Sequence, residues 1–467
     1  MGSIASVMDI AKQALIADQE ALNVTSSNVA NQNTAGYTQE VVAFNSSDSV
    51  TLSGATYGTG VTATATSQRD RVLNQQVQQQ TQVQSQASAL QSALEQVQNI
   101  FGLSSTASSA SSTVLGSATD SFFSSLSALT SNPSDPATRQ NVISTANSLA
   151  GAFNSAADQL GQISSDLNQQ AAADVSQVNA LTSTIASLNT QISSSYPTTD
   201  AGILEDQRQQ AITHLSQIVG LNQITTQDNG ITLTTSSGAV LVSGSQSYAL
   251  QATQIGGTTH ILAGVEAQDV TSNLTGGDLG GVLQARDQQL PSYLKSLDSL
   301  AYAIGTQVNQ QNELGIDGNG NPGNALFTLP ASSTGAASAI QVSTTDPNAV
   351  AAAGVGQGSA GNVNAIALSN LATAPIAGGQ SASSNLASFL SQVGSDTAGA
   401  TTNNSEQQTA LTQLTTQQDA LSGVSLDQEA ANLTQYQRSY QAASEVFTIA
   451  NALMATAINL GVETPVA

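Results

Sequence analysis

The sequence predicts a mainly α-helical protein with a small β insert, shaped as an elongated long-helix bundle built from both halves of the chain, with coiled-coil-like terminal helices. Apolar residues recur every seven positions near both ends of the chain. They also recur at helical spacing over residues 136 to 194, which as one unbroken helix would span on the order of 85 Å. Because a globular domain needs no helix of that length, the pattern indicates a rod.

The composition supports a folded protein with a largely uncharged surface. The chain has 467 residues, and 39% of them are hydrophobic, which is enough to bury a core. Only 8% are charged, against roughly a quarter in ordinary soluble domains, so polar uncharged residues and alanine must form most of the surface. The sequence contains no cysteine, which excludes a disulfide framework, a thiolate nucleophile and a cysteine-based zinc site.

The charge distribution argues against nucleic acid and anionic membranes as partners. The net charge is -23, and a phosphate backbone requires a clustered basic face. The basic residues are scattered, with Arg69 and Arg71 the only near neighbours: Lys12, Arg69, Arg71, Arg139, Arg208, Arg286, Lys295 and Arg438. The N-terminal segment lacks the basic and unbroken apolar regions of an ordinary signal peptide. No run approaches 18 apolar residues, so we expect no membrane insertion.

Residues 1 to 40 are predicted to form an N-terminal assembly helix followed by a polar signature. The helix of about four heptads carries one apolar stripe. The members of this stripe fall seven residues apart: Met8, Leu15, Leu22 and Val29. The segment "SNVANQNTAGYTQ", residues 27 to 39, then ends the helix and is too polar to be core.

Residues 41 to 214 are predicted as the first part of a helical rod domain. One helical seam covers residues 83 to 101, and a longer one begins after Asp135, which is placed to cap it, with Pro136 in the first helical position. The longer stripe has a weak patch at Asp174 and then resumes. We interpret these central stripes as intramolecular core.

Residues 215 to 278 are predicted as a small β-rich inserted domain. Apolar and polar residues alternate around Asn229-Gly230, the strongest short hairpin signal, and around a second turn at residues 236 to 238. The glycine-rich stretch "TGGDLGG", residues 275 to 281, lacks both the spacing and the lysine of a phosphate-binding loop. We interpret it as a tight return into the next helix.

Residues 279 to 424 are predicted as the second part of the helical rod domain. Pro291 is expected to kink the first turn of its helix. Residues 315 to 380 are rich in Gly, Ser and Ala and are predicted as irregular, with one short helix after Asp346-Pro347 and another over residues 363 to 371.

Residues 425 to 467 are predicted as the C-terminal assembly helix. Ser425 and Gln428 form a capping box that marks its start. Every seventh position is apolar: Leu426, Leu433, Tyr440, Phe447 and Met454. The alternate positions complete a strict three-four spacing: Tyr436, Ala443, Ala450 and Ala457. Such a stripe is typical of a helix that packs along another helix.

No catalytic, cofactor-binding or metal-binding residues are predicted. His214 and His260 are the two histidines, and nothing near them has metal-ligand spacing, so we assign them surface or packing roles. No Ser/His/Asp set can be nominated either, and we predict that the protein is not an enzyme.

One stretch partly matches a calcium-binding loop. In "DGNGNPGNALFT" the residues Asp317, Asn319 and Asn321 occupy the first, third and fifth positions of an EF-hand loop. Pro322 replaces the invariant glycine and Thr328 replaces the bidentate glutamate. We therefore predict an ordinary Gly/Asn turn.

The two ends of the chain resemble the axial proteins of the bacterial flagellum. The segment "NVANQNTAGYTQ" is similar to their shared N-terminal signature, an Asn-rich stretch followed by T-x-G-Y. The C-terminal segment "SGVSLDQEAANLTQYQRSYQAASEVFTIANALMATAINL" resembles their matching end. The signature positions in this sequence are Asn28, Asn31, Asn33, Thr34, Gly36 and Tyr37.

Four internal segments narrow the resemblance to the hook-associated protein 1 family, the first hook-filament junction protein. In chain order they are "NPSDPATRQ", "LEDQRQQAITHLSQIVG", "GGDLGGVLQARDQQL" and "VNQQNELGIDGNGNPG". The matches cover most of the chain.

The resemblance implies a secreted structural protein of the extracellular bacterial flagellum, exported by the flagellar type III apparatus. It implies assembly as a ring at the hook-filament junction, where it connects hook to filament and serves motility. The implied partners are the flagellar hook protein, the second hook-filament junction protein, further copies of this chain, and an export chaperone on the C-terminal helix. The implied assembly interface comprises both terminal stripes, with Tyr436, and the polar signature.

The sequence departs from the family pattern at three places. The stretch between "GNALF", residues 323 to 327, and the C-terminal helices is short, so we expect the large outer domain of longer relatives to be absent or vestigial. Gln39 stands where the family often has arginine, and "GVETPVA" extends past the usual C-terminal end.

Two alternatives belong to other functional classes. A self-polymerising flagellin-like filament protein or secreted adhesin would form abundant fibres from purified chain, whereas a junction protein should stay largely monomeric. A secreted enzyme with an unrecognised site would show turnover that depends on His214 or His260.

Overall fold

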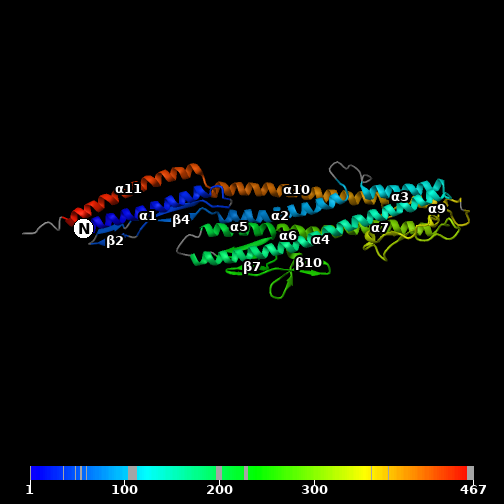
Figure 1. The fold of residues 1–467 in the computed structure, drawn as a ribbon, viewed down its shortest axis with the longest axis horizontal. Coiled ribbons are helices and arrows are strands. Elements are labelled where there is room, and N and C mark those ends of the chain that lie inside the picture. The colour runs from blue at the N-terminus through cyan, green and yellow to red at the C-terminus, as the bar shows by residue number, and fades with distance from the viewer. Residues whose placement is uncertain are drawn as a thin grey trace, which may run out of the picture.

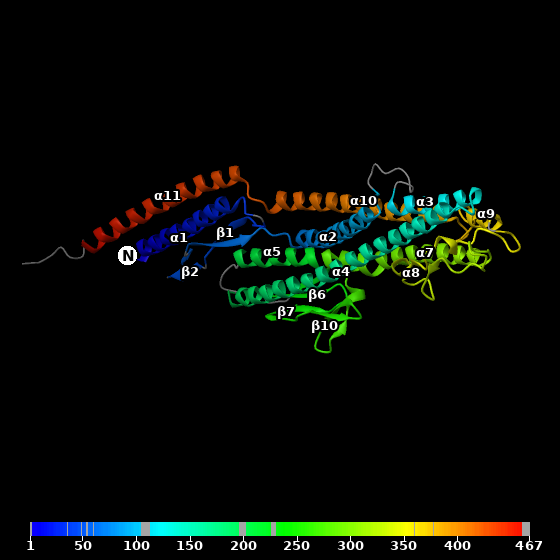
Figure 2. The same cartoon turned by 45° about the vertical axis from the view of Figure 1, so that its right-hand side comes forward.

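The protein is an elongated rod in which long helices run lengthwise, as Figure 1 and, after rotation, Figure 2 show. The computed structural model describes residues 2–34, 36–47, 49–52, 55–58, 60–103, 113–195, 202–225, 230–358, 360–376 and 378–459. Helices from both halves of the chain lie side by side, and small sheets are attached to them. The predicted fold class is therefore confirmed.

The first half of the chain starts at the end of the rod that holds the N-terminus, called the terminal end here. It runs to the opposite end, called the far end, and then back. α1 (Gly2–Asn31) leads through a β ribbon into α2 (Arg71–Ile100), and α3 (Val114–Ser131) lies at the far end. The long α4 (Pro136–Ser195) packs against α3 and returns to α5 (Gly202–Ile218), which packs against its other part.

The second half repeats this course. α6 (Gly277–Gln284), a π-helical turn (Ala285–Gln289) and α7 (Leu290–Glu313) form one continuous helical segment toward the far end. There the short α9 (Val363–Asn370) contacts both α3 and α7. The short α8 (Ala336–Ala339) packs between α7 and α4.

Two helices complete the rod. α10 (Ala382–Ser422) lies along α2, and α11 (Leu426–Asn459) lies along α1 at the terminal end. The helix of the C-terminal segment begins at Leu426, directly after Ser425, where the capping-box pattern predicts its start. The described residues also include 3₁₀ turns at Thr271–Asn273 and Pro347–Ala349.

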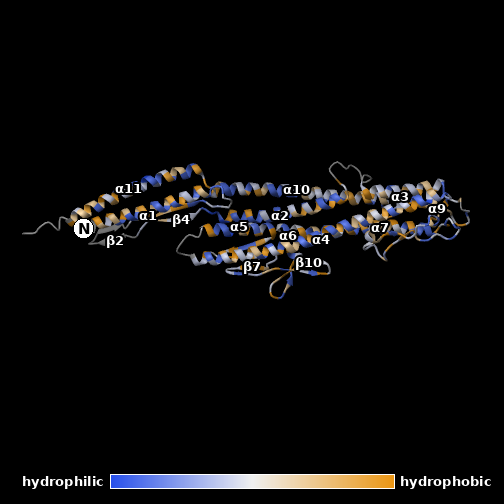
Figure 3. Ribbon diagram, viewed as in Figure 1, coloured by the Kyte–Doolittle hydropathy of each residue, from blue (hydrophilic) through white to orange (hydrophobic). Residues whose placement is uncertain are grey.

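α4 confirms the long helix that the sequence predicts. Its 60 residues span about 90 Å. The Asp135 carboxylate caps it by accepting hydrogen bonds from the backbone nitrogens of Ala137 (3.3 Å) and Thr138 (3.1 Å), and Pro136 is its first residue. Along the long helices hydrophobic and hydrophilic residues alternate in bands (Figure 3), as expected for helices that bury one face. Much of the α4 stripe is buried: Val142, Ala146, Leu149, Phe153, Leu160, Ile163 and Leu167.

The weak patch at Asp174 does not interrupt α4. Asp174 is 5% exposed and lies beside Asp278 at the start of α6. Burial, with a smaller contribution from Asp278, raises the pKa of the Asp174 carboxyl to about 7. A buried carboxylic acid that is protonated below neutral pH explains how one acidic residue fits into an apolar stripe.

The β insert consists of two small antiparallel sheets. One has four strands, β5 (Leu221–Thr225), β6 (Ile231–Thr235), β7 (Val240–Ser243) and β8 (Gln246–Ser247), in that order. The other has β10 (Thr258–Ala263) between β9 (Gln251–Ile255) and β11 (Gln268–Asp269). A third pair, β12 (Phe327–Thr328) and β13 (Gln341–Val342), lies in the irregular region.

The two predicted hairpin turns have different outcomes. Residues 236 to 238 do turn, since the Gly238 nitrogen donates to the Thr235 oxygen at 2.9 Å. Asn229 of the predicted Asn229-Gly230 turn lies outside the described residues. The strands on either side of it, β5 and β6, pair antiparallel from Leu221 opposite Thr235 to Thr225 opposite Ile231.

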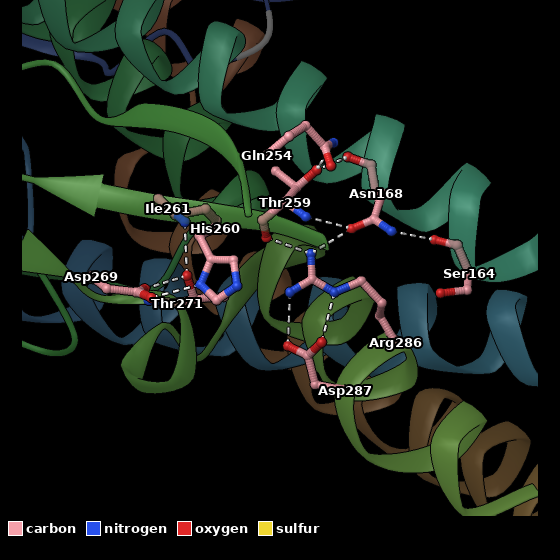
Figure 4. Close-up of polar contacts among 10 residues, drawn as sticks. All are labelled: Ser164, Asn168, Gln254, Thr259, His260, Ile261, Asp269, Thr271, Arg286 and Asp287. Carbon is pink, nitrogen blue, oxygen red and sulfur yellow. Dashed lines mark hydrogen bonds and ion pairs between the residues drawn. The ribbon is translucent and has the colours of Figure 1, made fainter. Parts of the chain in front are cut away.

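Asn168 and Arg286 attach the second small sheet to the rod (Figure 4). Asn168 on α4 accepts from the Thr259 nitrogen of β10 at 2.8 Å and from Arg286 Nη1 at 3.1 Å. Arg286, in the π-helical turn, also donates to the Thr259 oxygen at 2.7 Å. On the outer side, His260 pairs with Asp269 at 2.6 Å. His260 therefore makes a partly exposed polar contact at the surface of this sheet.

Residues 41 to 214, assigned from sequence to the first part of a helical rod domain, also contain strands that the sequence did not predict. Between α1 and α2, β1 (Glu40–Ser46) pairs with β4 (Val61–Ser67), and β2 (Ser49–Leu52) pairs with β3 (Ala55–Gly58), which gives a β ribbon. The two pairs share one continuous register. These strands are rich in Thr, Ser and Gly, so their sequence shows little alternation of apolar and polar residues. Burial does alternate along β4 in the structure, where one face of the strand packs against α1.

Pro291 lies in the first turn of α7, which directly follows the π-helical turn. The Leu290 nitrogen donates to the Ala285 oxygen. A π turn is a known way to absorb the missing backbone donor of a proline.

Candidate assembly interface

The seam between α1 and α11 is lined mostly by small residues. α1 is covered by α11 on one side and by the β ribbon on another. Its buried residues recur every three to four positions: Ala11, Ala17, Asp18, Ala21, Val24, Thr25 and Asn28. On α11 the buried residues are Glu429, Ala443 and Ala450. Since alanine buries little apolar area, this seam contributes less stability per residue than the core around α4.

The predicted apolar stripes lie at the edges of this seam. Seven of the ten residues are half-buried: Met8, Leu15, Leu22, Leu433, Tyr436, Phe447 and Met454. Three are exposed to solvent: Val29 at 39%, Leu426 at 48% and Tyr440 at 38%. The structure thus places both stripes on one helix pair. Tyr436 also packs against Phe44 of β1, with ring centroids 5.9 Å apart.

Sequence reasoning missed the most exposed apolar residues of this pair. Ile16 on α1 is 57% exposed, and Ile449 and Leu453 on α11 are 56% and 54% exposed. On α11 these two follow Val446 at spacings of three and four, so a search for a second stripe could have found them. In the part of the chain that the structure describes, α1 and α11 carry ten of the 25 exposed large apolar side chains. Such a concentration marks a surface that another protein covers.

The polar segment over residues 27 to 39 is partly buried, which corrects its interpretation as too polar for an interior. Its buried residues are Asn28 (1% exposed), Thr38 (8%) and Gln39 (6%). Asn31 and Tyr37 are half-buried, and the exposed signature residues are Asn33, Thr34 and Gly36. Burial is possible because the polar groups bind one another and residues far away in the sequence.

Asn28 lies at the centre of this network. Its Oδ1 accepts hydrogen bonds from the Tyr37 hydroxyl (2.9 Å) and the Glu40 nitrogen (3.0 Å). Its Nδ2 donates to the Glu40 oxygen (2.8 Å) and to Glu429 Oε1 (3.1 Å). One side chain therefore joins α1, the loop that follows it and α11.

Gln39 continues the network to the connection between α10 and α11. Its Nε2 donates to Glu429 Oε1 at 2.7 Å, and its backbone nitrogen donates to the Ser422 oxygen at 2.9 Å. The Ser422 hydroxyl in turn donates to the Gln68 oxygen at 3.0 Å. At the position where the family often has arginine, Gln39 supplies a donor to the buried Glu429 without adding a charge.

Thr38 joins the same loop to the rod. Its backbone nitrogen and hydroxyl donate to the two carboxylate oxygens of Asp206 on α5, at 3.1 and 3.0 Å. Asp206 also pairs with Arg69, which reaches Glu205 at 2.8 Å. The polar signature is therefore bonded to α11 on one side and to α5 on the other.

Gly36 is required by the geometry of this loop. Its φ is +77°, a region that favours glycine. A Cβ atom at this position would lie 2.9 Å from Cγ of Gln210 on α5. The T-x-G-Y pattern thus corresponds to a tight turn pressed against the rod.

The electrostatics of the terminal seam are acidic. Burial, followed by carboxylates that include Asp206 and Glu429, raises the pKa of the Tyr37 hydroxyl, which stays a hydrogen-bond donor. Burial, Glu429 and Asp18 likewise raise the pKa of Tyr436. Asp18 is 4% exposed, and its Oδ2 has no hydrogen-bond partner among the residues that the structure places. Such a buried oxygen lowers the stability of the helix pair.

The outer side of the signature borders a groove of about 560 Å³. Asn33, Thr34, Gly36 and Tyr37 line it from one side, and residues 423 to 425 line it from the connection between α10 and α11. The exposed half of the signature is thus presented beside the start of α11.

The structure offers little for metal chemistry. Within the described ranges, no three His, Asp or Glu side chains gather to hold a metal ion. The Asp317 carboxylate instead accepts hydrogen bonds from the Asn319 and Asn321 nitrogens, both at 2.8 Å, as in an ordinary turn. Among the same ranges, no helix has the length and hydrophobicity needed to cross a membrane.

Three family models match the chain. Residues 94–327, half of the chain, match the flagellar hook-associated protein FlgK helical domain. Residues 8–38 match the flagella basal body rod protein family, and residues 417–460 match the flagellar basal body rod FlgEFG protein C-terminal family. The two smaller matches fall on α1 with the polar signature and on α11.

Known proteins similar to this chain over nearly its whole length are also flagellar hook-associated proteins. Flagellar hook-associated protein 1 of Escherichia coli (strain K12) is 28% identical over 557 aligned positions, covering 98% of this chain and all of the relative. That of Bacillus subtilis (strain 168) is 28% identical over 502 positions, covering 97% of each chain. Both alignments are longer than this chain of 467 residues, so the relatives contain segments that it lacks.

A solved structure shares the fold. The flagellar hook junction protein FlgK from Burkholderia pseudomallei superimposes with a TM-score of 0.67 and 19% sequence identity, over 74% of this chain and 99% of the other. With the helical-domain match and the full-length relatives, this shows that the chain belongs to the flagellar hook-associated protein 1 (FlgK) family, the structural proteins of the hook-filament junction.

Proposed function

We propose that this protein is exported and assembles outside the cell as a ring that connects the flagellar hook to the filament. Its role is structural and not catalytic. Neighbours in the assembly are the hook protein, the second hook-filament junction protein and further copies of this chain. The family of the chain supports the location, and the surface of its terminal helices supports the mode of assembly.

The observation that carries this proposal is the row of exposed apolar residues on α11. Val446, Ile449 and Leu453 are 46%, 56% and 54% exposed, and their spacing places them on one face. Burying such a side chain contributes roughly 1.5 to 3 kcal/mol. Repeated in every subunit of a ring, this contribution is enough to make assembly cooperative while leaving the monomer soluble.

The predicted stripes contribute to the same interface from its edges. Met8, Leu15 and Leu22, which are half-buried, stabilise the pairing of α1 with α11. The exposed Val29 and Tyr440 extend the outer surface. The exposed signature residues Asn33, Thr34 and Gly36 offer polar contacts to a neighbouring subunit, and the buried Asn28 and Gln39 position the helix pair.

An export chaperone binds α11 before assembly in this proposal. Its exposed apolar residues would otherwise associate too early, and an amphipathic helix laid in a groove is a common mode of recognition. The double substitution Tyr440→Ala and Phe447→Ala should weaken the purified complex with the chaperone. Unchanged affinity would argue against α11 as the site.

A double substitution on the exposed face tests the assembly itself. Ile449→Asp with Leu453→Asp should allow export but abolish stable filaments, because two carboxylates cannot be buried between subunits. Gln437→Asp with Gln441→Asp, at exposed polar positions of the same helix, is the matched control. Motility, filament subunits shed into the medium, and immunogold labelling of hook tips are the measurements.

The outcomes of that experiment are distinct. Loss of filaments with normal export and an unchanged unfolding midpoint of the monomer supports the interface. Normal swimming with the Ile449→Asp, Leu453→Asp protein at the hook tip would show that this face makes no assembly contact. Loss of export would place these residues in the secretion step instead.

A further inference from the structure

The exposed side of α1 carries a row of three residues with different chemistry. Lys12, Ile16 and Glu20 follow one another at spacings of four, so they lie on one face of the helix. All three are exposed, and Ile16 is exposed by 57%. In chain order this outer row of α1 therefore presents a positive charge, a large apolar side chain and a negative charge.

A second row lies on the exposed side of α11. Arg438, Ala442, Glu445 and Ile449 follow one another at spacings of four, three and four, and all are exposed. Ile449 also belongs to the row of exposed apolar residues on α11 described above. This outer row of α11 is therefore continuous with the proposed assembly surface.

The charges of the two rows are complementary when the helices run in opposite directions. In each row the positive charge comes before the negative one, so an antiparallel arrangement places unlike charges face to face. Lys12 and Glu20 are eight residues apart, about 12 Å along a helix, and Arg438 and Glu445 are seven residues apart, about 10 Å. The two spacings therefore agree to about one residue.

The structure of one molecule places these charges at matching heights. Within the molecule α1 and α11 already run antiparallel and are joined by the contact between Asn28 and Glu429. Counting from that contact, Glu20 lies eight residues back along α1, and Arg438 lies nine residues further along α11. A neighbouring copy with the same orientation and about the same height therefore brings the two outer rows together in register.

We propose that the outer row of α1 in one copy packs antiparallel against the outer row of α11 in the next copy. Ile16 contacts Ala442 at the centre of this interface. Two intersubunit ion pairs flank it: Lys12 with Glu445, and Glu20 with Arg438. This inference rests on the proposed ring and specifies its subunit contact.

Charge and symmetry both favour a second copy as the occupant. Lys12 and Arg438 are the only basic residues in the sequences of α1 and α11, and the pairing places each of them opposite an acid. Copies of a chain with net charge -23 otherwise repel one another, and such pairs fix register and partner choice. Because each copy contributes two different faces, the contact repeats from copy to copy until a ring closes.

The absence of cysteine from the sequence allows a disulfide test without background. The full chain with Ile16→Cys and Ala442→Cys replaces the wild type in cells, and isolated flagella are oxidised. We expect dimers and higher multimers on a non-reducing gel, because a disulfide forms only between Cα atoms within about 7 Å. Either single substitution should give monomer alone, since the contact joins two different faces. Ile16→Cys with Gln437→Cys, at an exposed position on another face of α11, is the matched control and should give monomer as well.

Immunogold labelling of hook tips distinguishes failure of this contact from failure of the proposed ring. Label at the hook tips without multimers from the Ile16→Cys, Ala442→Cys chain would overturn the contact and leave the ring in place. Multimers from Ala442→Cys alone would show a symmetric contact and would also overturn it. Absence of the wild-type chain from hook tips would overturn the ring, and the contact with it.

A charge exchange tests the register without cysteines. Arg438→Glu should reduce the fraction of hooks that bear filaments several-fold, because it places two acids face to face between copies. Adding Glu20→Arg to the same chain should restore that fraction. Lys295→Glu, at an exposed position of α7, is the control for the change in net charge and should leave the fraction unchanged. No restoration by Glu20→Arg would show that Glu20 and Arg438 do not meet in the ring.

Discussion

The side-chain amide of Asn28 on α1 donates a hydrogen bond of 3.1 Å to the buried carboxylate of Glu429 on α11, 401 residues later in the chain. The surrounding seam is lined by alanines such as Ala21 and Ala443, which can slide past one another at little cost. A buried polar contact can fix the register of such a helix pair. We interpret Asn28 and Glu429 as the residues that set how the two termini align.

Asn28→Ala should loosen the terminal helices without unfolding the rod. Glu429 would lose a donor and the Tyr37 hydroxyl an acceptor, at a cost of about 1 to 3 kcal/mol. Hydrogen exchange should become faster in α1 and α11 and stay unchanged in α4. Asn33→Ala, at an exposed signature position, is the control. Equal exchange in the two variants would show that the Asn28 contacts do not hold the helix pair.

The terminal helices of the isolated chain should exchange much faster than the rod. Their seam is mostly alanine and includes the unpartnered Asp18 Oδ2, so it offsets little of the ordering entropy of about 1 to 2 kcal/mol per residue. Hydrogen exchange of a verified monomer, compared over residues 4 to 30, 430 to 459 and α4, measures this. Protection of the two terminal segments equal to that of α4 would contradict it.

Gly36→Ala should destabilise the signature loop more than a glycine replacement elsewhere. A left-handed backbone costs a non-glycine residue about 1 to 2 kcal/mol, and the added methyl would also collide with Gln210. Gly102→Ala separates these effects, since Gly102 has a φ of +62° but no atom of the described residues within 4 Å of an added Cβ. The loss in free energy of unfolding should be larger for Gly36→Ala. Equal losses would mean that Gln210 moves aside freely.

Asp174→Asn should stabilise the rod in a pH-dependent manner. The folded-state pKa of about 7 lies above the usual value of 3.8, so the folded protein binds the proton more tightly than the unfolded chain does. Stability from this group is therefore full below about pH 4 and is lost as pH rises through 7. Urea unfolding at pH 5 and pH 8 should show a gain for Asp174→Asn mainly at pH 8.

The control for Asp174 is Asp158→Asn, an exposed position on the same helix. Its effect on the free energy of unfolding should be small and similar at both pH values. A pH-independent effect of Asp174→Asn would show that the burial of this carboxyl beside Asp278 does not shift its protonation.

Asn168→Ala should loosen the attachment of the second small sheet. The Thr259 nitrogen and Arg286 Nη1 would lose their shared acceptor, and a buried arginine with fewer partners is costly. Exchange in β9 and β10 should become faster, while β5 to β8 stay unchanged. Gln159→Ala, exposed on the same helix, is the control. No change in β10 would show that apolar packing alone holds the sheet.

The sequence determined the features that depend on neighbouring residues. Helical periodicity and the Asp135-Pro136 start suffice to predict α4, and the heptad spacing predicts α1 and α11, because these signals repeat within a few turns. The alternation of apolar and polar residues also predicts most of the β insert. It does not predict the β ribbon formed by β1 to β4, since small polar residues give these strands little alternation and the face of β4 that packs is decided by its contact with α1.

Only the tertiary structure decided which polar residues become buried and paired. Asn28 and Gln39 look like surface residues in sequence, and Glu429 like one more helical acid, until folding brings them together from positions about 400 residues apart. Hydrogen bonds and charges act over a few ångströms of space, and no local pattern records which distant residues will share that space.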